Sequence, residues 1–163
     1  MHDQLADHPP LQAVYDGTQA RFAADLTDWT FARGELSVAV GRDRLVELLT
    51  FLRDELGFCA LNDVIGLDHH PAEGRPRFEV LYQLYRFPEA TRLRVRVAVA
   101  EGETLPSITP LYPGANWPER EIFDLLGVAF SGHPDLKRIL LPDDWQGHPL
   151  RKDYPLGGGK DGL

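Results

Sequence analysis

Residues 78–99, FEVLYQLYRFPEATRLRVRVAV, alternate apolar with polar side chains on both sides of a short turn that contains Pro88. A period of two places successive side chains on opposite faces of a strand, so this stretch predicts two strands joined by a turn. The second strand is the more regular. Its aliphatic face comprises Leu93, Val95, Val97 and Val99, and its basic face comprises Arg92, Arg94 and Arg96.

Upstream, residues 35–40 alternate in the same way and predict a further strand. Residues 58–65 predict another strand, which we expect to be buried on both faces because its alternation is not clean. Residues 42–56 are the strongest helix candidate, with Gly57 as its stop. Their apolar stripe at helical spacing comprises Leu45, Leu48, Leu49, Leu52 and Leu56. A helix between strands, followed by two strands joined by a turn, predicts an α+β fold. We expect a mixed or antiparallel sheet of about four strands, with helices on one face.

A second, shorter helix is predicted after residue 115. Asn116 stands three residues before Glu119, as in a capping box, and Gly127 ends the helix. Before residue 35 the sequence offers only a weak helix candidate at residues 11–26. These patterns divide the chain into an N-terminal helical lead-in (1–34), an α+β domain (35–127) and a long extended C-terminal tail (128–163).

The tail loses the regular pattern but keeps its apolar residues. Prolines at positions 134, 142, 149 and 155 exclude a long helix or a central strand. A disordered segment would have few aromatic and branched side chains, which is not the composition of this one. The tail therefore either folds back over its own sheet or lies extended across another protein and buries its apolar residues there. We favour the second alternative, and we expect residues 157–163 to be a loose end.

Composition excludes several classes of function. The chain has 163 residues, with 17 Lys and Arg against 25 Asp and Glu, so the net charge of −8 argues against binding to nucleic acid or anionic lipid. Cys59 is the only cysteine, which excludes an internal disulfide and a thiolate-ligated iron–sulfur cluster; we expect it to be buried as a small apolar residue. The sequence shows neither a membrane-spanning run nor a signal peptide. We therefore expect a cytoplasmic protein whose membrane attachment comes through a partner.

The tail and the helix before it carry a family resemblance. Residues 116–127, NWPEREIFDLLG, continue as GHPDLKRILL at 132–141 and DDWQGHPLRKDYP at 143–155. This run resembles the 30-kilodalton subunit, designated C, of the proton-pumping NADH:quinone oxidoreductase, respiratory complex I. The resemblance implies a non-catalytic assembly subunit of the hydrophilic arm, peripheral on the cytoplasmic face of the cell membrane. The resemblance further implies that this subunit supports electron transfer from NADH to quinone, coupled to proton translocation.

The resemblance also implies where cofactors and partners lie. The subunit itself carries no cofactor, whereas FMN, iron–sulfur clusters and quinone belong to partner subunits. The tail is implied to wrap along the quinone-site subunit, a 49-kilodalton protein similar to the hydrogenase large subunit. The same motif occurs in membrane-bound nickel–iron hydrogenases and formate hydrogenlyases, which remain an alternative. A free-standing metal hydrolase that uses the histidines of two Gly-His-Pro turns is a remote one. These histidines lack the spacing of metal ligands, and hydrogen bonds to backbone carbonyls or a place at an interface explain them better.

No catalytic, cofactor-binding or metal-binding residue is predicted; the functional residues are expected at a partner interface. Arg120 and Asp124 are i, i+4 neighbours and are expected to form an ion pair there. Residues 151–153 either form a solvated loop or dock against acidic groups of the partner. Trp145 is expected to anchor the contact. The predicted interface residues are Glu119, Arg120, Asp124, His133, Pro134, Arg138, Trp145, His148, Pro149, Arg151, Lys152, Asp153 and Tyr154.

Overall fold

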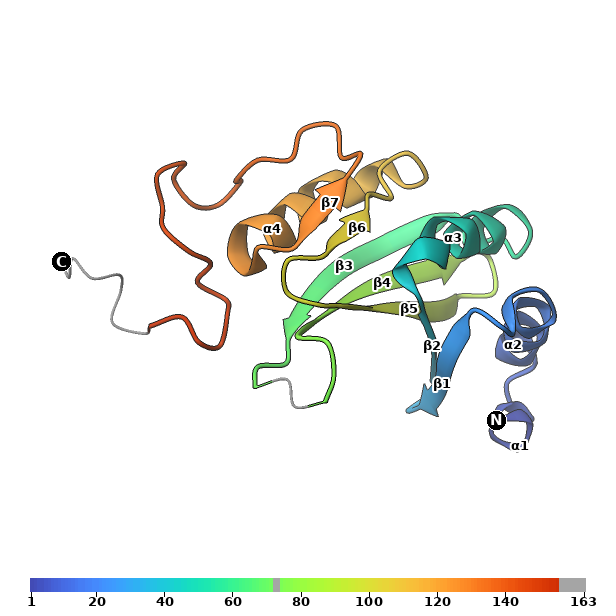
Figure 1. The fold of residues 1–163 in the computed structure, drawn as a ribbon. Helices are drawn as coiled ribbons and strands as arrows, with labels where there is room; N and C mark the ends of the chain where they lie inside the picture. Colours follow the sequence, from blue (N-terminus) through green and yellow to red (C-terminus); the bar gives the residue numbers. More distant parts are fainter. Residues whose placement is uncertain (72–73, 156–163) are drawn as a thin grey trace.

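The computed structural model describes residues 1–71 and 74–155 (Figure 1). Its helices are α1 (His2–Leu5), α2 (Pro9–Phe22), α3 (Leu45–Asp54) and α4 (Asn116–Leu126). Its strands are β1 (Leu26–Ala32), β2 (Glu35–Val40), β3 (Ala60–Asp68), β4 (Phe78–Arg86), β5 (Thr91–Val99), β6 (Thr104–Pro106) and β7 (Ala129–Ser131). Single 3-10 turns, Arg42–Arg44 and Pro113–Ala115, lead into α3 and α4.

The main sheet has five strands in the order β1-β2-β5-β4-β3. Neighbouring strands are antiparallel except β2 and β5, which are parallel, and β4 pairs with β5 along its whole length from Phe78 opposite Val99 to Arg86 opposite Thr91. A separate pair, β6 with β7, is parallel. The predicted α+β fold with a mixed sheet is confirmed.

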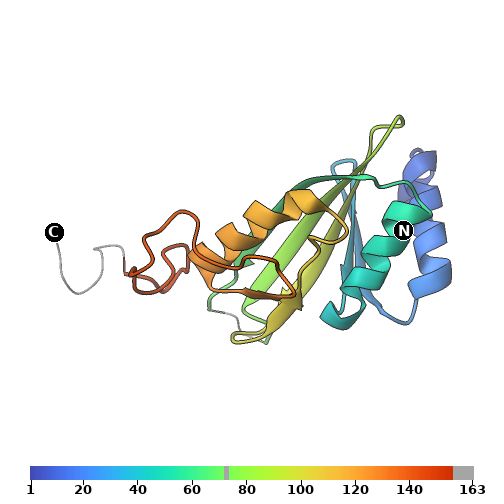
Figure 2. The same cartoon turned by 90° about the horizontal axis from the view of Figure 1, so that it is seen from above.

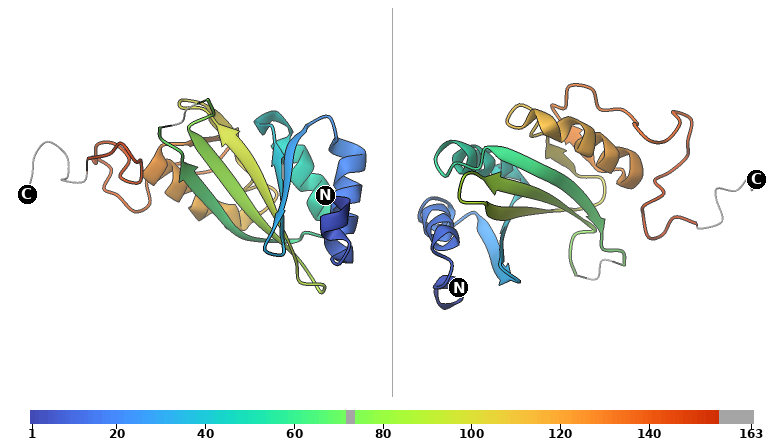
Figure 3. Two further views of the ribbon diagram at one scale, coloured as in Figure 1. Left: turned by 90° about the horizontal axis from the view of Figure 1, so that it is seen from below. Right: turned by 180° about the vertical axis from the view of Figure 1, so that it is seen from behind.

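The core lies on one face of the main sheet. The aliphatic face of β5 is buried together with the matching residues of β2 and β4, whereas the arginines of β5 point to the other face. Figure 2 shows α3 and α4 along the covered face, and the left view of Figure 3 shows the opposite face without a helix over it. On that open face Arg94 pairs with Glu35 at 2.8 Å, and Arg96 with Asp28 at 2.6 Å. The predicted division of β5 into an aliphatic and a basic face is confirmed.

The lead-in contains a strand that the sequence pattern did not reveal. The predicted helix at residues 11–26 is found as α2, but the chain then enters β1, which pairs antiparallel with β2 and adds a fifth strand. Trp29 and Phe31 of β1 are only half-buried, so the apolar alternation is weak. The indole Nε1 of Trp29 donates to Gln19 of α2 at 3.0 Å, and its ring meets that of Tyr15 edge-on. Contact with α2 thus fixes this strand.

Two predictions about residues 58–65 are wrong. The strand begins at Ala60, runs on to Asp68, and lies at the edge of the sheet, where only Val64 and Asp68 are buried. One face of this strand belongs to the open side of the sheet, so it is not buried on both faces, and the unclean alternation reflects a register shift between Leu61 and Asp63. Cys59, just before the strand, is exposed and not buried as expected.

The close contact between β3 and α4 depends on Gly66. A Cβ at that position would lie 2.5 Å from Leu126 Cδ1 and 3.2 Å from Ile122. We expect Gly66→Ala to lower the free energy of unfolding by about 1–3 kcal/mol, because overpacking forces the helix off the strand. Chemical denaturation measures this, with Gly41→Ala as the control, since nothing lies within 4 Å of a Cβ there. Equal stabilities of the two variants would contradict the prediction.

Candidate functional site: the surface built by α4 and the tail

The acidic residue in the first turn of α4, Glu119, is buried inside the protein. The N-cap is Ala115 without a side-chain cap, and Asn116 is already helical, so the predicted capping box is wrong. Glu119 is fully buried; its carboxyl accepts a hydrogen bond from the Ser107 hydroxyl at 2.6 Å and another from the Ile108 amide at 2.8 Å. Burial raises the pKa of Glu119 despite these two donors. Glu119 therefore ties the segment after β6 to α4, and in this chain it presents no surface to a partner.

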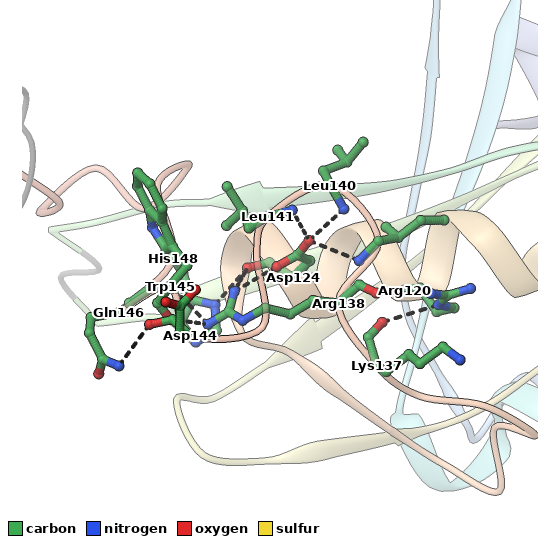
Figure 4. A network of polar contacts seen from close by, with 12 residues as sticks. Arg120, Asp124, Lys137, Arg138, Leu140, Leu141, Asp144, Trp145, Gln146 and His148 are labelled. Carbon is green, nitrogen blue, oxygen red and sulfur yellow. Dashed lines mark hydrogen bonds and ion pairs between the residues drawn. The ribbon is translucent and has the colours of Figure 1, made fainter.

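Asp124, near the end of α4, binds the tail through hydrogen bonds. One carboxylate oxygen accepts from the backbone amides of Ile139, Leu140 and Leu141 at 3.0, 2.8 and 2.9 Å. The other oxygen accepts from the Arg138 guanidinium at 2.6 Å (Figure 4). Burial alone would raise the pKa of this carboxyl, but the amides and Arg138 lower it to about 2. Asp124 is thus a charged, completely buried acceptor for four groups of the tail.

The expected ion pair between Arg120 and Asp124 is wrong. Asp124 pairs with Arg138, fourteen residues away in sequence, while Arg120 donates to the backbone carbonyls of Lys137 and Arg138 at 3.1 and 2.8 Å. Helical spacing places Arg120 near Asp124. The tail, however, supplies the carboxylate with more hydrogen-bond donors, namely three backbone amides and the Arg138 guanidinium. Arg120 and Asp124 of α4 therefore both act as attachment points for the tail.

A second buried carboxylate holds the far end of the tail. Asp68, the last residue of β3, accepts from the Lys152 amide at 2.9 Å and pairs with Arg77 at 3.1 Å. Arg77 also pairs with Asp153 at 2.6 Å. Burial opposes ionisation of Asp68, yet Arg77 and the amides of Lys152 and His70 lower its pKa to about 2. The tail is therefore held at two points, Asp124 and Asp68.

The two Gly-His-Pro turns contact opposite ends of α4. His133 Nε2 donates to the Asn116 carbonyl at 3.0 Å, and His148 Nδ1 donates to the Asp124 carbonyl at 2.8 Å. The predicted hydrogen bonds from these histidines to backbone carbonyls are confirmed. Pro134 and Pro149 follow them in the same turns, where they exclude regular structure. Within residues 1–71 and 74–155, no group of three or more His, Cys, Asp or Glu side chains is placed to hold a metal ion.

Between its anchors the tail leaves apolar side chains in solvent. Val128 and Phe130 are buried, but beyond β7 the apolar residues are at most half-buried. The exposed fractions are 61% for Leu140, 39% for Trp145 and 59% for Leu150, and Trp117 at the start of α4 reaches 70%. These four side chains, here called the apolar surface, lie on α4 and the tail. Figure 1 shows α4 and the tail on the side of the molecule away from α2. In Figure 4 Leu140 points away from Asp124 and α4.

A hollow of about 270 Å³ lies beside the contact between α4 and the edge strand β3. Apolar residues of both elements line it together with Asp63 and Glu121, and Leu150 of the tail also lines it. A second hollow lies beside Trp117 and Pro118 at the start of α4. The surface formed by α4 and the tail thus has protruding apolar side chains next to shallow hollows, a shape suited to a protein partner.

Apart from Pro134, Pro149 and Lys152, the predicted interface residues separate into three groups. Glu119 and Asp124 are buried inside the chain, which corrects their placement at the interface. Internal hydrogen bonds or ion pairs occupy the side chains of Arg120, His133, Arg138, His148, Arg151, Asp153 and Tyr154. Trp145 is exposed, and its role as an anchor stays a prediction. Arg151 pairs with Glu101 at 2.8 Å, while Lys152 and Asp153 are exposed, so whether residues 151–153 dock against a partner stays a prediction.

Sequence reasoning missed four residues of this region. Asp68 and Arg77 come from β3 and the start of β4, far from the tail in sequence, and no local pattern connects them with it. Trp117 and Leu140 stand within the quoted motif and could have been noted as large apolar side chains beside prolines and charges. Residues 156–163, including the predicted loose end, lie outside the described residues.

The chain is similar to known proteins in sequence and in fold. Residues 38–160 match the family model described as respiratory-chain NADH dehydrogenase, 30 Kd subunit. The chain is 46% identical over 139 residues to the C subunit of NADH-quinone oxidoreductase from Geobacter metallireducens, and the match covers 85% of each chain. It is 52% identical over 128 residues to the protein of the same name from Roseiflexus sp., and that match covers 77% of this chain and 72% of the relative. A chain from the structure of the membrane-bound sulfane sulfur reductase, an archaeal respiratory membrane complex, has the same fold, with a TM-score of 0.76 at 20% identity, over 89% of this chain and 85% of that one.

Proposed function

The chain belongs to the family of the 30 kDa subunit of respiratory-chain NADH dehydrogenase, also named the C subunit of NADH-quinone oxidoreductase, and from this premise we propose that it acts by docking, through α4 and the tail, onto the quinone-site subunit. It is a structural component of an oxidoreductase complex of the respiratory chain, which transfers electrons from NADH to quinone. The hydrogenase and hydrolase alternatives are not favoured, because the relatives carry the name of the NADH enzyme.

The apolar surface is the observation that carries the docking proposal. Monomeric proteins seldom leave several large apolar side chains together in water, and such groups mark interaction sites. Here Trp117, Leu140, Trp145 and Leu150 stand on α4 and the tail, and the guanidinium groups of Arg120 and Arg138 are already paired within the chain. A partner that covers this surface would gain apolar burial and would leave these two arginines with the partners they have.

The partner and the location follow from the same family. We infer that the partner is the 49-kilodalton quinone-site subunit, and that FMN, iron–sulfur clusters and quinone are bound by other subunits. None of the helices in the described part of the chain has the length and apolar character to cross a membrane. Attachment to the membrane then comes through the complex, on the cytoplasmic face.

Trp145→Ala tests the proposal. We expect it to weaken docking by about 2 kcal/mol or more, the usual size of an interface hot spot. The free chain should lose much less stability, because Trp145 belongs neither to the buried core nor to the side chains packed against it. The measurements are affinity for the complex purified without this subunit, and thermal unfolding of the free chain.

Phe87→Ala is the matched control for Trp145→Ala. Phe87 is an exposed aromatic residue in the turn between β4 and β5, outside the apolar surface. Its replacement should leave docking unchanged. A Trp145→Ala chain that binds like the wild type, but melts several degrees lower, would show that Trp145 belongs to the domain core and that docking uses another surface.

A further inference from the structure

We propose that residues 138–153 form a docking element that the chain builds on its own domain before a partner binds, and that Arg138 positions Trp145 within it. This inference rests on the proposed function, because it concerns how the same surface is presented. The alternative is a tail that becomes ordered only on its partner. The two models predict different behaviour of the free chain.

Both ends of the docking element are fixed by buried carboxylates. Asp124 accepts the amides of three successive residues at its start, and Asp68 accepts the Lys152 amide at its end. If the tail left, Asp124 would exchange all four of its tail donors for water. Hydrogen bonds to an ionised carboxylate are among the strong ones, and here they lower its pKa to about 2, so the free chain should keep the tail in place.

Arg138 connects the first anchor to the exposed tryptophan. Its Nη1 donates to the Asp124 carboxylate at 2.6 Å, while Nη2 donates to the carbonyls of Trp145 and Gly147 at 3.0 and 3.2 Å (Figure 4). A guanidinium is planar and holds its donors at fixed angles, so it sets the backbone at Trp145 relative to α4.

The backbone beyond Trp145 is held as well. Gly147 has φ +84°, a conformation that side chains with a Cβ rarely adopt, and a Cβ there would lie 2.9 Å from the Tyr154 ring. The Tyr154 hydroxyl donates to the Gln146 carbonyl at 3.3 Å, and the Leu150 amide donates to the Leu125 carbonyl of α4 at 3.1 Å. The turn that displays Trp145 and Leu150 is thus closed by contacts within the chain.

A surface built in advance saves the entropy of ordering it during association. Immobilising flexible groups on binding costs affinity, and preorganisation removes that cost. Arg138 would then influence docking without contacting the partner, through the orientation of Trp145. This role can be distinguished from a direct contact, because it must also change the free chain.

Two variants of the full chain test the role of Arg138. Arg138→Gln removes the charge, and Arg138→Lys keeps a cation beside Asp124 but cannot bridge to both carbonyls at once, so it remains informative if the first variant folds poorly. Lys137→Gln is the matched control, since the Lys137 side chain pairs only with the neighbouring Asp135 at 3.0 Å among the described residues. Hydrogen exchange at the Trp145 and Leu150 amides reports on the free chain. Rebinding to the complex purified without this subunit reports on docking.

We expect both Arg138 variants to exchange faster at these amides and to bind about tenfold more weakly, whereas Lys137→Gln behaves like the wild type. Faster exchange with unchanged affinity would overturn the inference, because the partner would then be ordering the segment, while the proposed docking would stand. Unchanged exchange would also overturn it, since Arg138 would not position the turn. Failure of the proposed function is seen separately, as normal binding of Trp145→Ala.

Discussion

Removal of residues 132–163 should abolish incorporation of the chain into its complex while leaving a folded domain. The cut after Ser131 keeps β7, its pairing with β6 and the buried side chain of Phe130. It removes every exposed apolar residue of the tail, so the docking surface retains only Trp117. The protein composition of the complex, purified from cells that carry the shortened chain, measures incorporation, and circular dichroism with thermal melting measures folding.

The choice of this cut, and its control, follow from the structure. A cut after Gly127 would take Val128 and Phe130 out of the core, so loss of folding would be mistaken for loss of docking. Removal of residues 156–163 alone leaves both carboxylate anchors and Trp145 in place, and that chain should assemble normally. Incorporation of the chain lacking residues 132–163 at the wild-type level would show that the tail is dispensable for assembly.

Sequence patterns predicted those elements whose side chains face a single environment. Strand β5 was clear, because aliphatic residues meet the core and arginines meet solvent in strict alternation. Helix α3 was clear for the same reason at helical spacing. Strand β1 was missed because its two aromatic residues pack against α2 only in part, and β3 was misjudged because an edge position is a property of sheet order. Sheet order depends on long-range pairing, which no local window contains.

The site was predictable in outline and not in its internal contacts. The motif located α4 and the tail, and the excess of apolar residues beside prolines indicated a surface for a partner. The pairing of Asp124 was wrong because the i, i+4 rule compares only neighbours on the helix, whereas the tail supplies four donors from fourteen to seventeen residues away. Asp68 lies even farther away, 84 residues before Lys152. Such contacts are decided by the folded path of the chain.

Acid should release the tail, because both of its anchors are carboxylates with depressed pKa values. The pKa is about 2 for Asp124 and for Asp68 in the folded chain, against an ordinary value of 3.8. A carboxyl group whose pKa is lower in the folded chain than in the unfolded chain stabilises the folded state. This stabilisation is complete above about pH 4 and is lost as the pH falls through about 2. The difference is worth roughly 2–3 kcal/mol per group, and about 5 kcal/mol for both. Glu119 has the opposite effect, because burial raises its pKa above the ordinary value of 4.5. Its contribution to stability is complete at low pH and falls as the pH rises above that value, so it does not mimic a loss of stability in acid.

Asp68→Asn and Asp124→Asn, alone and together, isolate this effect from that of other carboxyls. We expect the double variant at pH 6 to be less stable than the wild type by up to about 5 kcal/mol, and the difference to shrink as the pH falls to about 2, where half of the wild-type anchors are protonated. Chemical denaturation across this pH range gives the free energies, and amide exchange at Leu140 and Lys152 shows whether the lost stability belongs to the tail. A difference that stays constant with pH would mean that the substitutions act through packing. The charge on Asp68 and Asp124 would then not be what holds the docking element on its domain.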